Sequence, residues 1–249
     1  MLSYIYKKSL QLINGHPLIK HMYFNLAVFC SNHGISPPLS GNADRVEKRW
    51  REQTPGDSSR DPLLYVEHDE SVDLLFMEIL SFLDEDANIL EIGCNAGRNL
   101  NYLYSKGFKR LTGIEIGAKA EEAMKEYFPD AYKSTKYIVG NAYEELLRLP
   151  SSHYDLVFVH SVLVNIAPRW NAIFKEMARV SKSYVLTMES EGSYLAYPRD
   201  FEKMFKKVGL KQILYKFYNL SGERRILSPQ FIRNEIFRNN TIRLFVHVN

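Results

Sequence analysis

The sequence predicts an α/β fold: a seven-stranded sheet, mostly parallel, with an antiparallel pair at its C-terminal edge, helices on both faces and an N-terminal helical extension. Three patterns carry this prediction. From about residue 63, short apolar runs alternate with helical segments, as in parallel strands joined by crossover helices. Residues 89–92 and 156–159 are almost wholly apolar, which is typical of strands covered on both faces. The last two strand-like runs have no clear helix between them, which favours an antiparallel pair.

The N-terminal part of the chain reads as an extension of this sheet domain. Residues 1–30 carry apolar side chains at mixed helical spacing, which favours a helix packed on its own domain or on a second subunit over one lying on a membrane surface. Residues 31–42 contain Pro37, Pro38 and two glycines, which predicts a linker. Asp44 and Glu47 form a capping-box pattern that predicts a helix over 44–53. We therefore divide the chain into an N-terminal helical extension or cap, residues 1–62, and one α/β domain, residues 63–249.

The domain itself is predicted element by element from hydrophobic periodicity. The predicted order is a helix at 71–83, a strand at 87–93, a helix at 98–106, a strand at 110–116, a helix at 118–128, a strand at 136–140, a helix at 143–149, a strand at 154–160, a helix at 170–180, a strand at 183–189 and two closing strands at 210–220 and 241–249.

Composition excludes several classes of protein. In 249 residues, 45% are hydrophobic and 24% charged, which are ordinary values for a globular protein and exclude collagen-like and disordered chains. The net charge of +3 does not call for nucleic acid or an anionic membrane as partner, although the basic C-terminal quarter could face an anionic substrate. The two cysteines are far apart and predict neither a disulfide framework nor a zinc site. With no apparent signal peptide or transmembrane segment, we expect a cytoplasmic protein.

The strongest local signal is the run LEIGCNAGRNL, residues 90–100. It reads as a buried strand that ends at Gly93, a tight turn through Asn95 and Gly97, and the start of a helix. Such a turn brings backbone close to a ligand and presents free amides at a helix N-terminus. The dinucleotide pattern G-x-G-x-x-G fails, because its three glycine positions hold Gly93, Asn95 and Arg98. This argues against an NAD-dependent oxidoreductase.

The same run fits E-x-G-C-x-x-G and resembles the first motif of class I S-adenosylmethionine-dependent methyltransferases. The resemblance implies that residues 63–249 form a Rossmann-like methyltransferase domain whose cofactor is S-adenosyl-L-methionine, with S-adenosyl-L-homocysteine as product. The family's commonest form has Gly in place of Asn95, and Asn also tolerates the left-handed conformation. The variant GCNAGRNL is similar to a group associated with nonulosonic (pseudaminic acid type) sugar biosynthesis. The cofactor contacts implied here are Glu91, Gly93, Cys94, Asn95, Ala96 and Gly97.

Two further segments extend the implied cofactor site. Glu115 lies at a strand end about twenty residues after the turn, where a carboxylate can accept hydrogen bonds from both ribose hydroxyls. Its neighbour Ile116 is expected to contact the cofactor too. By resemblance, residues 140–142 are the adenine-contacting loop: Asn141 would accept from the adenine amino group through its carbonyl oxygen, and Ala142 would offer its backbone amide.

The fourth predicted strand and the loop after it give the catalytic candidates. The sugar-associated group tends to have a VLIHINP-like run, whereas this chain has VLVNIAP with Asn165 in place of His. His160, at the carboxyl end of the strand, is then the candidate for a cofactor contact and for a general base. The Asp/Asn-Pro-Pro-aromatic motif of amino-methyltransferases is absent. Candidates for the acceptor pocket are Arg49, Trp50, Asn165, Tyr194 and Tyr197, and Glu189 and Glu191 either face the acceptor or are solvated.

We therefore predict methyl transfer from S-adenosylmethionine, by direct in-line transfer, to an oxygen of a small molecule such as a sugar or sugar-derived metabolite. Methylation of protein or RNA is the first alternative, supported only by the basic C-terminal quarter. Non-catalytic binding of S-adenosylmethionine is the second, since Asn95, Asn141 and Asn165 depart from the family's commonest residues. No metal is expected, nucleic acid is disfavoured as a partner, and a homodimer is left open.

Overall fold

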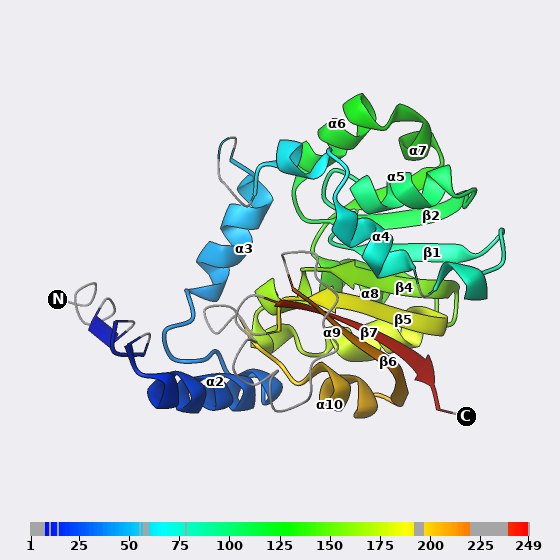
Figure 1. Cartoon of the computed structure of the whole chain (residues 1–249). Coiled ribbons are helices and arrows are strands. Elements are labelled where there is room, and N and C mark those ends of the chain that lie inside the picture. Colours follow the sequence, from blue (N-terminus) through cyan, green and yellow to red (C-terminus); the bar gives the residue numbers. More distant parts are fainter. Residues whose placement is uncertain are drawn as a thin grey trace.

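The computed structural model describes residues 8–9, 11–13, 15–54, 56, 60–77, 79–191, 197–219 and 239–248. Its sheet has seven strands in the order β3-β2-β1-β4-β5-β7-β6 (Figure 1). The first five are parallel, and β7 runs antiparallel to both β5 and β6. The predicted fold class is confirmed. The strands are β1 (Asn88–Ile92), β2 (Arg110–Glu115), β3 (Thr135–Val139), β4 (Tyr154–His160), β5 (Ser181–Glu189), β6 (Leu210–Asn219) and β7 (Asn239–His247).

Two hydrophobic clusters lie on opposite faces of this sheet. Along β4, Val157 and Val159 belong to one cluster and Leu156 and Phe158 to the other, because successive side chains of a strand point to opposite faces. The first cluster takes in α8 (Ala142–Arg148), α9 (Ile173–Val180) and α10 (Phe201–Lys206). The second takes in α4 (Glu70–Phe76), α5 (Arg98–Ser105), α6 (Ala118–Tyr127) and α7 (Pro129–Lys133). Burial of these strands on both faces explains why their sequences are continuously apolar.

The sheet has a topological switch point between β1 and β4. From β1 the chain builds outward through β2 and β3, and then returns to place β4 on the other side of β1. In an open parallel sheet the connections leave in opposite directions at such a point, which opens a crevice beyond the carboxyl ends of the strands. The loops after β1 and β4 therefore frame the position at which a ligand is expected.

Several predicted element boundaries were wrong. The helix predicted at 71–83 ends at Phe76 and is followed by a separate 3₁₀ turn, η2 (Leu80–Phe82). The helix predicted at 170–180 begins at Ile173, after the 3₁₀ turns η3 (Leu163–Asn165) and η4 (Pro168–Trp170). The short helix α10 lies in a stretch for which no helix was predicted.

Two of the helical segments described in the N-terminal extension stand beyond the ends of the strands (Figure 1). The first, α2 (Pro17–Asn32), meets the domain at its C-terminal end, where the Asn171 side chain donates to the Ser31 carbonyl and the Asn32 side chain accepts from the Asp200 amide. The second, α3 (Ala43–Glu52), is capped by Asn42, whose side chain accepts from the Arg45 amide, and not by Asp44 as predicted. None of the described helices is long and apolar enough to cross a membrane.

Candidate functional site

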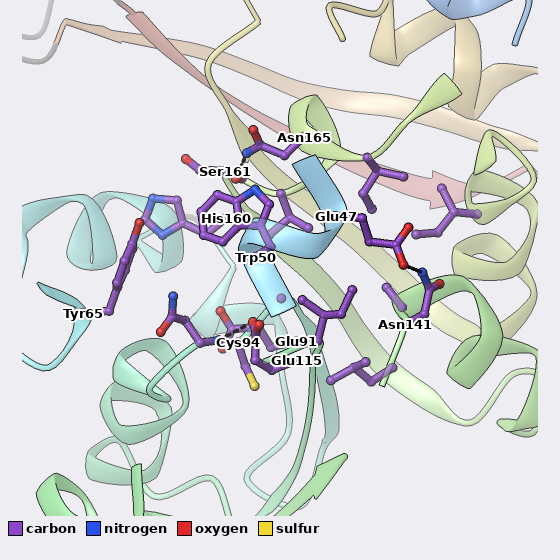
Figure 2. A pocket seen from close by; sticks show the side chains of 18 of the residues that line it. Glu47, Trp50, Tyr65, Glu91, Cys94, Glu115, Asn141, His160, Ser161 and Asn165 are labelled. Carbon is purple, nitrogen blue, oxygen red and sulfur yellow. Dashed lines mark hydrogen bonds between the residues drawn. The ribbon is translucent and has the colours of Figure 1, made fainter. Parts of the chain in front are cut away.

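A cavity of about 560 Å³ opens at the carboxyl ends of β1, β2 and β4, at the switch point of the sheet (Figure 2). This volume lies within the range of small-molecule sites. Eleven of the residues proposed from the sequence line it, from five separate segments: Trp50, Glu91, Gly93, Cys94, Asn95, Glu115, Ile116, Asn141, Ala142, His160 and Asn165.

The turn after β1 has the backbone conformation that the sequence predicts. Gly93, Asn95 and Gly97 all have positive φ, of 75°, 45° and 79°, so Asn95 adopts the left-handed conformation in which the family commonly has Gly. The side chain of Asn95 accepts from the Ala96 amide at 2.8 Å, which stabilises this conformation locally. A Cβ on Gly97 would lie 2.4 Å from the Met124 sulfur, so glycine is needed here for close packing as well.

Glu91 is buried at the end of β1, and only one of its two carboxylate oxygens accepts a hydrogen bond among the described residues. Its Oε1 accepts from Asn99 Nδ2 at 2.6 Å, whereas Oε2 and the Asn99 carbonyl oxygen have no hydrogen-bond partner among the described residues. Burial raises the pKa of this carboxyl to about 8, although the Asn99 hydrogen bond and the charge of Arg98 lower it. An orphaned carboxylate oxygen of this kind is a site for a cationic or hydrogen-bond-donating group of a ligand.

We expect Glu91→Gln to flatten the pH dependence of stability of the ligand-free protein. The folded-state pKa of about 8 lies above the usual 4.5, so the stabilising contribution is complete below pH 4.5 and is lost as pH rises through about 8. The slope of the unfolding free energy should change by up to about 1.4 kcal/mol per pH unit. Urea denaturation from pH 5 to pH 8.5 measures it, with the exposed Glu122→Gln as the matched control. Parallel curves for wild type and Glu91→Gln would contradict the assignment.

Glu115 is a second buried carboxylate, held by backbone from two sides. Its Oε2 accepts from the Asn95 amide and its Oε1 from the Gly117 amide, both at 3.0 Å. The side chain of Gln53 also lies within 3.4 Å of Oε1. Burial raises the pKa of the Glu115 carboxyl, and the backbone hydrogen bonds lower it. These bonds fix the carboxylate between the turn after β1 and the start of α6.

Asn141 reaches the cavity but its carbonyl oxygen is already engaged. That oxygen caps α8, accepting from the amides of Tyr143 at 3.0 Å and Glu144 at 3.4 Å. Its side-chain amide donates to Glu47 of α3 at 3.5 Å, a contact visible in Figure 2. The predicted hydrogen bond from the adenine amino group to this oxygen therefore has to compete with the cap, and it stays a prediction.

His160 ends β4 and lines the same cavity. Burial and the positive charge of Arg98 lower its pKa to about 4, against the charge of Asp69, which raises it. The imidazole is therefore neutral at neutral pH and has one ring nitrogen able to accept a proton. Asp69 lies 3.7 Å from Arg98, so the two charges beside His160 form an ion pair.

Four aromatic side chains form what we call the aromatic wall of the cavity. Trp50 comes from α3, Trp170 from η4, and Tyr65 and Tyr143 lie on two other segments. Trp170 and Tyr143 pack with ring centroids 5.3 Å apart. Both indole N–H groups are buried and have no hydrogen-bond partner among the described residues. The aromatic wall therefore combines flat apolar faces with two buried, unpartnered indole donors.

Some predicted site residues do not line the cavity. Arg49 is exposed on α3. Tyr197 is buried, and its hydroxyl donates to the Gly41 carbonyl at 3.4 Å. Ala96 and Gly97 lie in the turn but behind its cavity-facing surface. Tyr194 lies outside the described residues.

The two glutamates after β5 are also placed differently from the expectation. Glu189 is fully buried and accepts from the backbone amides of residues 162, 163 and 164, so it is neither solvated nor part of the cavity lining. Burial raises its pKa to about 7, and these backbone amides lower it. Glu191 pairs with Arg243 at 2.6 Å. Both residues hold structure around the site.

Sequence reasoning missed several polar or aromatic residues of the lining, among them Glu47, Tyr65, Asp69, Arg98 and Trp170. Glu47 lies one helical turn before Trp50 on the same face of α3, and that spacing could have found it. Arg98 belongs to the GRNL run that was already quoted. Tyr65, Asp69 and Trp170 carry no local signal, because only the packing of distant segments brings them to the cavity. Among the residues described, no cluster of His, Cys, Asp or Glu is placed to hold a metal ion.

Residues 90–185 match the protein family described as a methyltransferase domain. The fold is similar to geranyl diphosphate C-methyltransferase from Streptomyces coelicolor A3(2), with a TM-score of 0.60 and 9% identity over 83% of this chain and 97% of that one. It is also similar to magnesium protoporphyrin IX methyltransferase from Synechocystis, with a TM-score of 0.59 and 13% identity over 83% and 99% of the two chains. The [4+2]-cyclase SpnF gives a TM-score of 0.56 and 13% identity over 79% and 86%. A comparison with curated protein sequences found no match.

Proposed function

We propose that this chain, which contains a match to a methyltransferase domain, transfers the methyl group of S-adenosylmethionine to a hydroxyl of a small polyhydroxylated acceptor, with a sugar or sugar-derived metabolite as the leading candidate. One observation carries the proposal. A single cavity of about 560 Å³ joins the cofactor-type residues at the strand ends to a wall of aromatic side chains, with His160 in the same lining. A donor and a small acceptor can therefore share one water-poor space.

The residues at the strand ends fit the chemistry of S-adenosylmethionine. Its amino-acid head carries an ammonium and a carboxylate, which match the orphaned Glu91 Oε2 and the guanidinium of Arg98, whose Nε is also unpartnered among the described residues. Glu115 can accept from ribose hydroxyls. Ile116 and the 140–142 loop line the side on which the base would lie. These assignments are proposals, and they add Arg98 to the contacts that the sequence predicted.

When bound, the sulfonium supplies an already activated methyl group, so the protein has to align the acceptor and exclude water. The aromatic wall and α3 enclose the acceptor side. Neutral His160 can take the proton that a hydroxyl loses as it is methylated. The proposal assigns this role to the imidazole because it lines the cavity and is uncharged at neutral pH; burial lowers its pKa to about 4, so it acts as a weak base.

The aromatic wall supports a sugar-like acceptor more than a large one. Flat aromatic faces stack on the apolar faces of sugar rings, and the two unpartnered indole N–H groups can donate to hydroxyl oxygens. Part of this wall comes from α3, so we propose that residues 1–62 act as a cap over the acceptor. A cytoplasmic location and a homodimer stay predictions.

The proposal is tested by incubating the full chain with isotopically labelled S-adenosylmethionine and three acceptor classes: nucleotide-linked and free sugars, total RNA, and denatured protein. Mass spectrometry should find the label on an oxygen of a sugar-type compound. Label on RNA or protein alone would show that the acceptor is a macromolecule and would contradict the proposed small-molecule acceptor. Binding of the cofactor without transfer to any acceptor class would favour the non-catalytic alternative.

His160→Gln should separate catalysis from binding. Without an imidazole to accept the proton, kcat should fall by about 100-fold, the lower end of what a general base contributes. The affinity for S-adenosylhomocysteine, measured by calorimetry, should change by less than about 3-fold. An unchanged kcat would remove His160 from the reaction and leave the hydroxyl to ionise without help from the chain.

A further inference from the structure

Gln53 directly follows α3. It is fully buried, although α3 itself consists mostly of polar side chains and has no buried residue. It adopts the left-handed conformation, with φ of 42° and ψ of 61°, and its amide still bonds back to the Arg49 carbonyl. A non-glycine residue in this region is strained, and such strain persists only where surrounding contacts hold it. The contacts of the Gln53 side chain are therefore informative.

Both polar atoms of the Gln53 side chain form hydrogen bonds near the carboxyl end of β2. Its Oε1 accepts from the Ala120 amide at 3.0 Å, in the first turn of α6, and its Nε2 donates to Glu115 Oε1 at 3.4 Å. Among the described residues, Gln53 is the one whose side chain donates to this carboxylate. Gln53 is not part of the cavity lining, so it holds Glu115 from behind and leaves the cavity side open.

Gly117 provides the space for this contact. A Cβ on Gly117 would lie 2.0 Å from Gln53 Cδ and 2.2 Å from its Oε1. The backbone of Gly117 has φ of −101°, which any residue adopts, so the demand for glycine comes from the Gln53 side chain and not from the turn itself. Glycine at position 117 thus leaves the space that the Gln53 side chain needs to reach Glu115.

We infer that Gln53 is a positioning residue for the cofactor ribose: it orients the Glu115 carboxylate and makes the segment before the methyltransferase domain part of the cofactor site. The inference rests on the proposed function, in which Glu115 accepts from the ribose hydroxyls. Asn95 and Gly117 fix the carboxylate through backbone amides, and Gln53 adds the third donor, a charge-assisted one.

The same helix that ends in Gln53 also faces the acceptor side of the cavity. Ala43, Glu47 and Trp50 line the cavity from positions i, i+4 and i+7 of α3, which share one helical face. Lys119 fastens the helix end by donating to the carbonyls of Glu52 at 3.1 Å and Gln53 at 3.4 Å. Gln53 therefore connects the Glu115 carboxylate, which is proposed to bind the ribose, to the same short helix that lines the acceptor side.

The test compares two ligands by calorimetry: S-adenosylhomocysteine and its analogue without the two ribose hydroxyls. The proteins are wild type, Gln53→Met, which keeps the length of the side chain but forms neither hydrogen bond, and Lys48→Met on the exposed side of α3 as the matched control. Gln53→Met should weaken binding of S-adenosylhomocysteine by about 10-fold, the value of one hydrogen bond to a charged group. Binding of the dihydroxyl-free analogue should stay within about 2-fold of wild type, and Lys48→Met should resemble wild type with both ligands.

A second variant keeps Gln53 but displaces it. Gly117→Ala introduces the Cβ that would meet Gln53 Cδ, so it should show the same ligand-selective loss even if Gln53→Met folds poorly. The double variant should lose little more than either single one, because both act on one contact. Selective loss in either variant supports the inference.

Equal weakening of both ligands would overturn the inference, since it would mean that Gln53 serves only to dock α3. Unchanged binding in both variants would overturn it as well. The wild-type measurement isolates the proposed function: if wild type does not bind S-adenosylhomocysteine, or binds both ligands alike, the assignment of Glu115 fails and the inference falls with it.

Discussion

Glu115→Ala is expected to weaken binding of S-adenosylhomocysteine by at least about 100-fold. Two hydrogen bonds from ribose hydroxyls to a buried carboxylate, at roughly 1.5 kcal/mol or more each, correspond to this factor. The substitution also removes the acceptor of the Asn95 and Gly117 amides, which loosens the turn after β1. Both effects act in the same direction.

Calorimetric titration measures this loss, and two further variants identify its source. Glu115→Gln keeps one acceptor oxygen and should fall between wild type and Glu115→Ala. Glu121→Ala, a glutamate on the neighbouring helix α6 that contacts Tyr132 and does not line the cavity, should change the affinity by less than about 2-fold. Full affinity in Glu115→Ala would show that the ribose lies elsewhere and would contradict the proposed position of the cofactor.

Arg199→Met is expected to lower the free energy of unfolding by about 3 kcal/mol. Arg199 is only 3% exposed, and its guanidinium donates to the carbonyls of Leu163 and Ile166 at 2.7 Å each and to that of Tyr197 at 3.1 Å. Its Nε also donates to the Asn171 side chain at 2.9 Å. Methionine would leave the buried carbonyls of Ile166 and Tyr197 without this donor, whereas that of Leu163 would keep the Ile166 amide at 3.2 Å. Each carbonyl left unpaired costs about 1–3 kcal/mol before water or local relaxation compensates.

The same change should affect the acceptor side more than the cofactor side. Arg199 braces the loop that carries Asn165 and Trp170 to the cavity, so KM for the acceptor should rise while the affinity for S-adenosylhomocysteine changes less than about 3-fold. Urea denaturation checks the stability loss. Arg169→Met is the matched control, because the exposed Arg169–Asp44 pair at 2.6 Å is worth less than about 1 kcal/mol. A loss in Arg199→Met no larger than in this control would contradict the brace.

The parts of the fold that sequence reasoning predicted are those set by local pattern. Buried strands such as residues 156–159 are continuously apolar, and the turn after β1 needs residues that accept positive φ, so both are visible in a short window. The order of the sheet follows from crossover geometry and the closing antiparallel pair. Position in the sheet in turn brought Glu91, Glu115 and His160 to one cavity.

What was missed depends on contacts between distant segments. Gln53 meets Glu115 across 62 residues, and the Asn171 side chain meets the Ser31 carbonyl across 140, so neither contact leaves a local trace. Arg199 lies in a loop, and no local pattern marks its contacts with residues 163–171. The N-cap of α3 was misplaced by two residues because Asn42, Asp44 and Glu47 all suit a helix start, and tertiary contacts decide between them: Arg169 pairs with Asp44 within the first turn.

The way α3 is held has a consequence for how this protein could change its substrate over evolutionary time. The helix has no buried residue, and polar contacts fasten it at its two ends. Exchanging Glu47 or Trp50 would therefore reshape the acceptor wall without opening a void in either hydrophobic cluster. Acceptor preference can drift on this helix at small cost in stability, while the sheet and its turn continue to bind the same donor. Under the proposed function, the face of α3 that lines the cavity can therefore vary, provided that Gln53 at its end is kept.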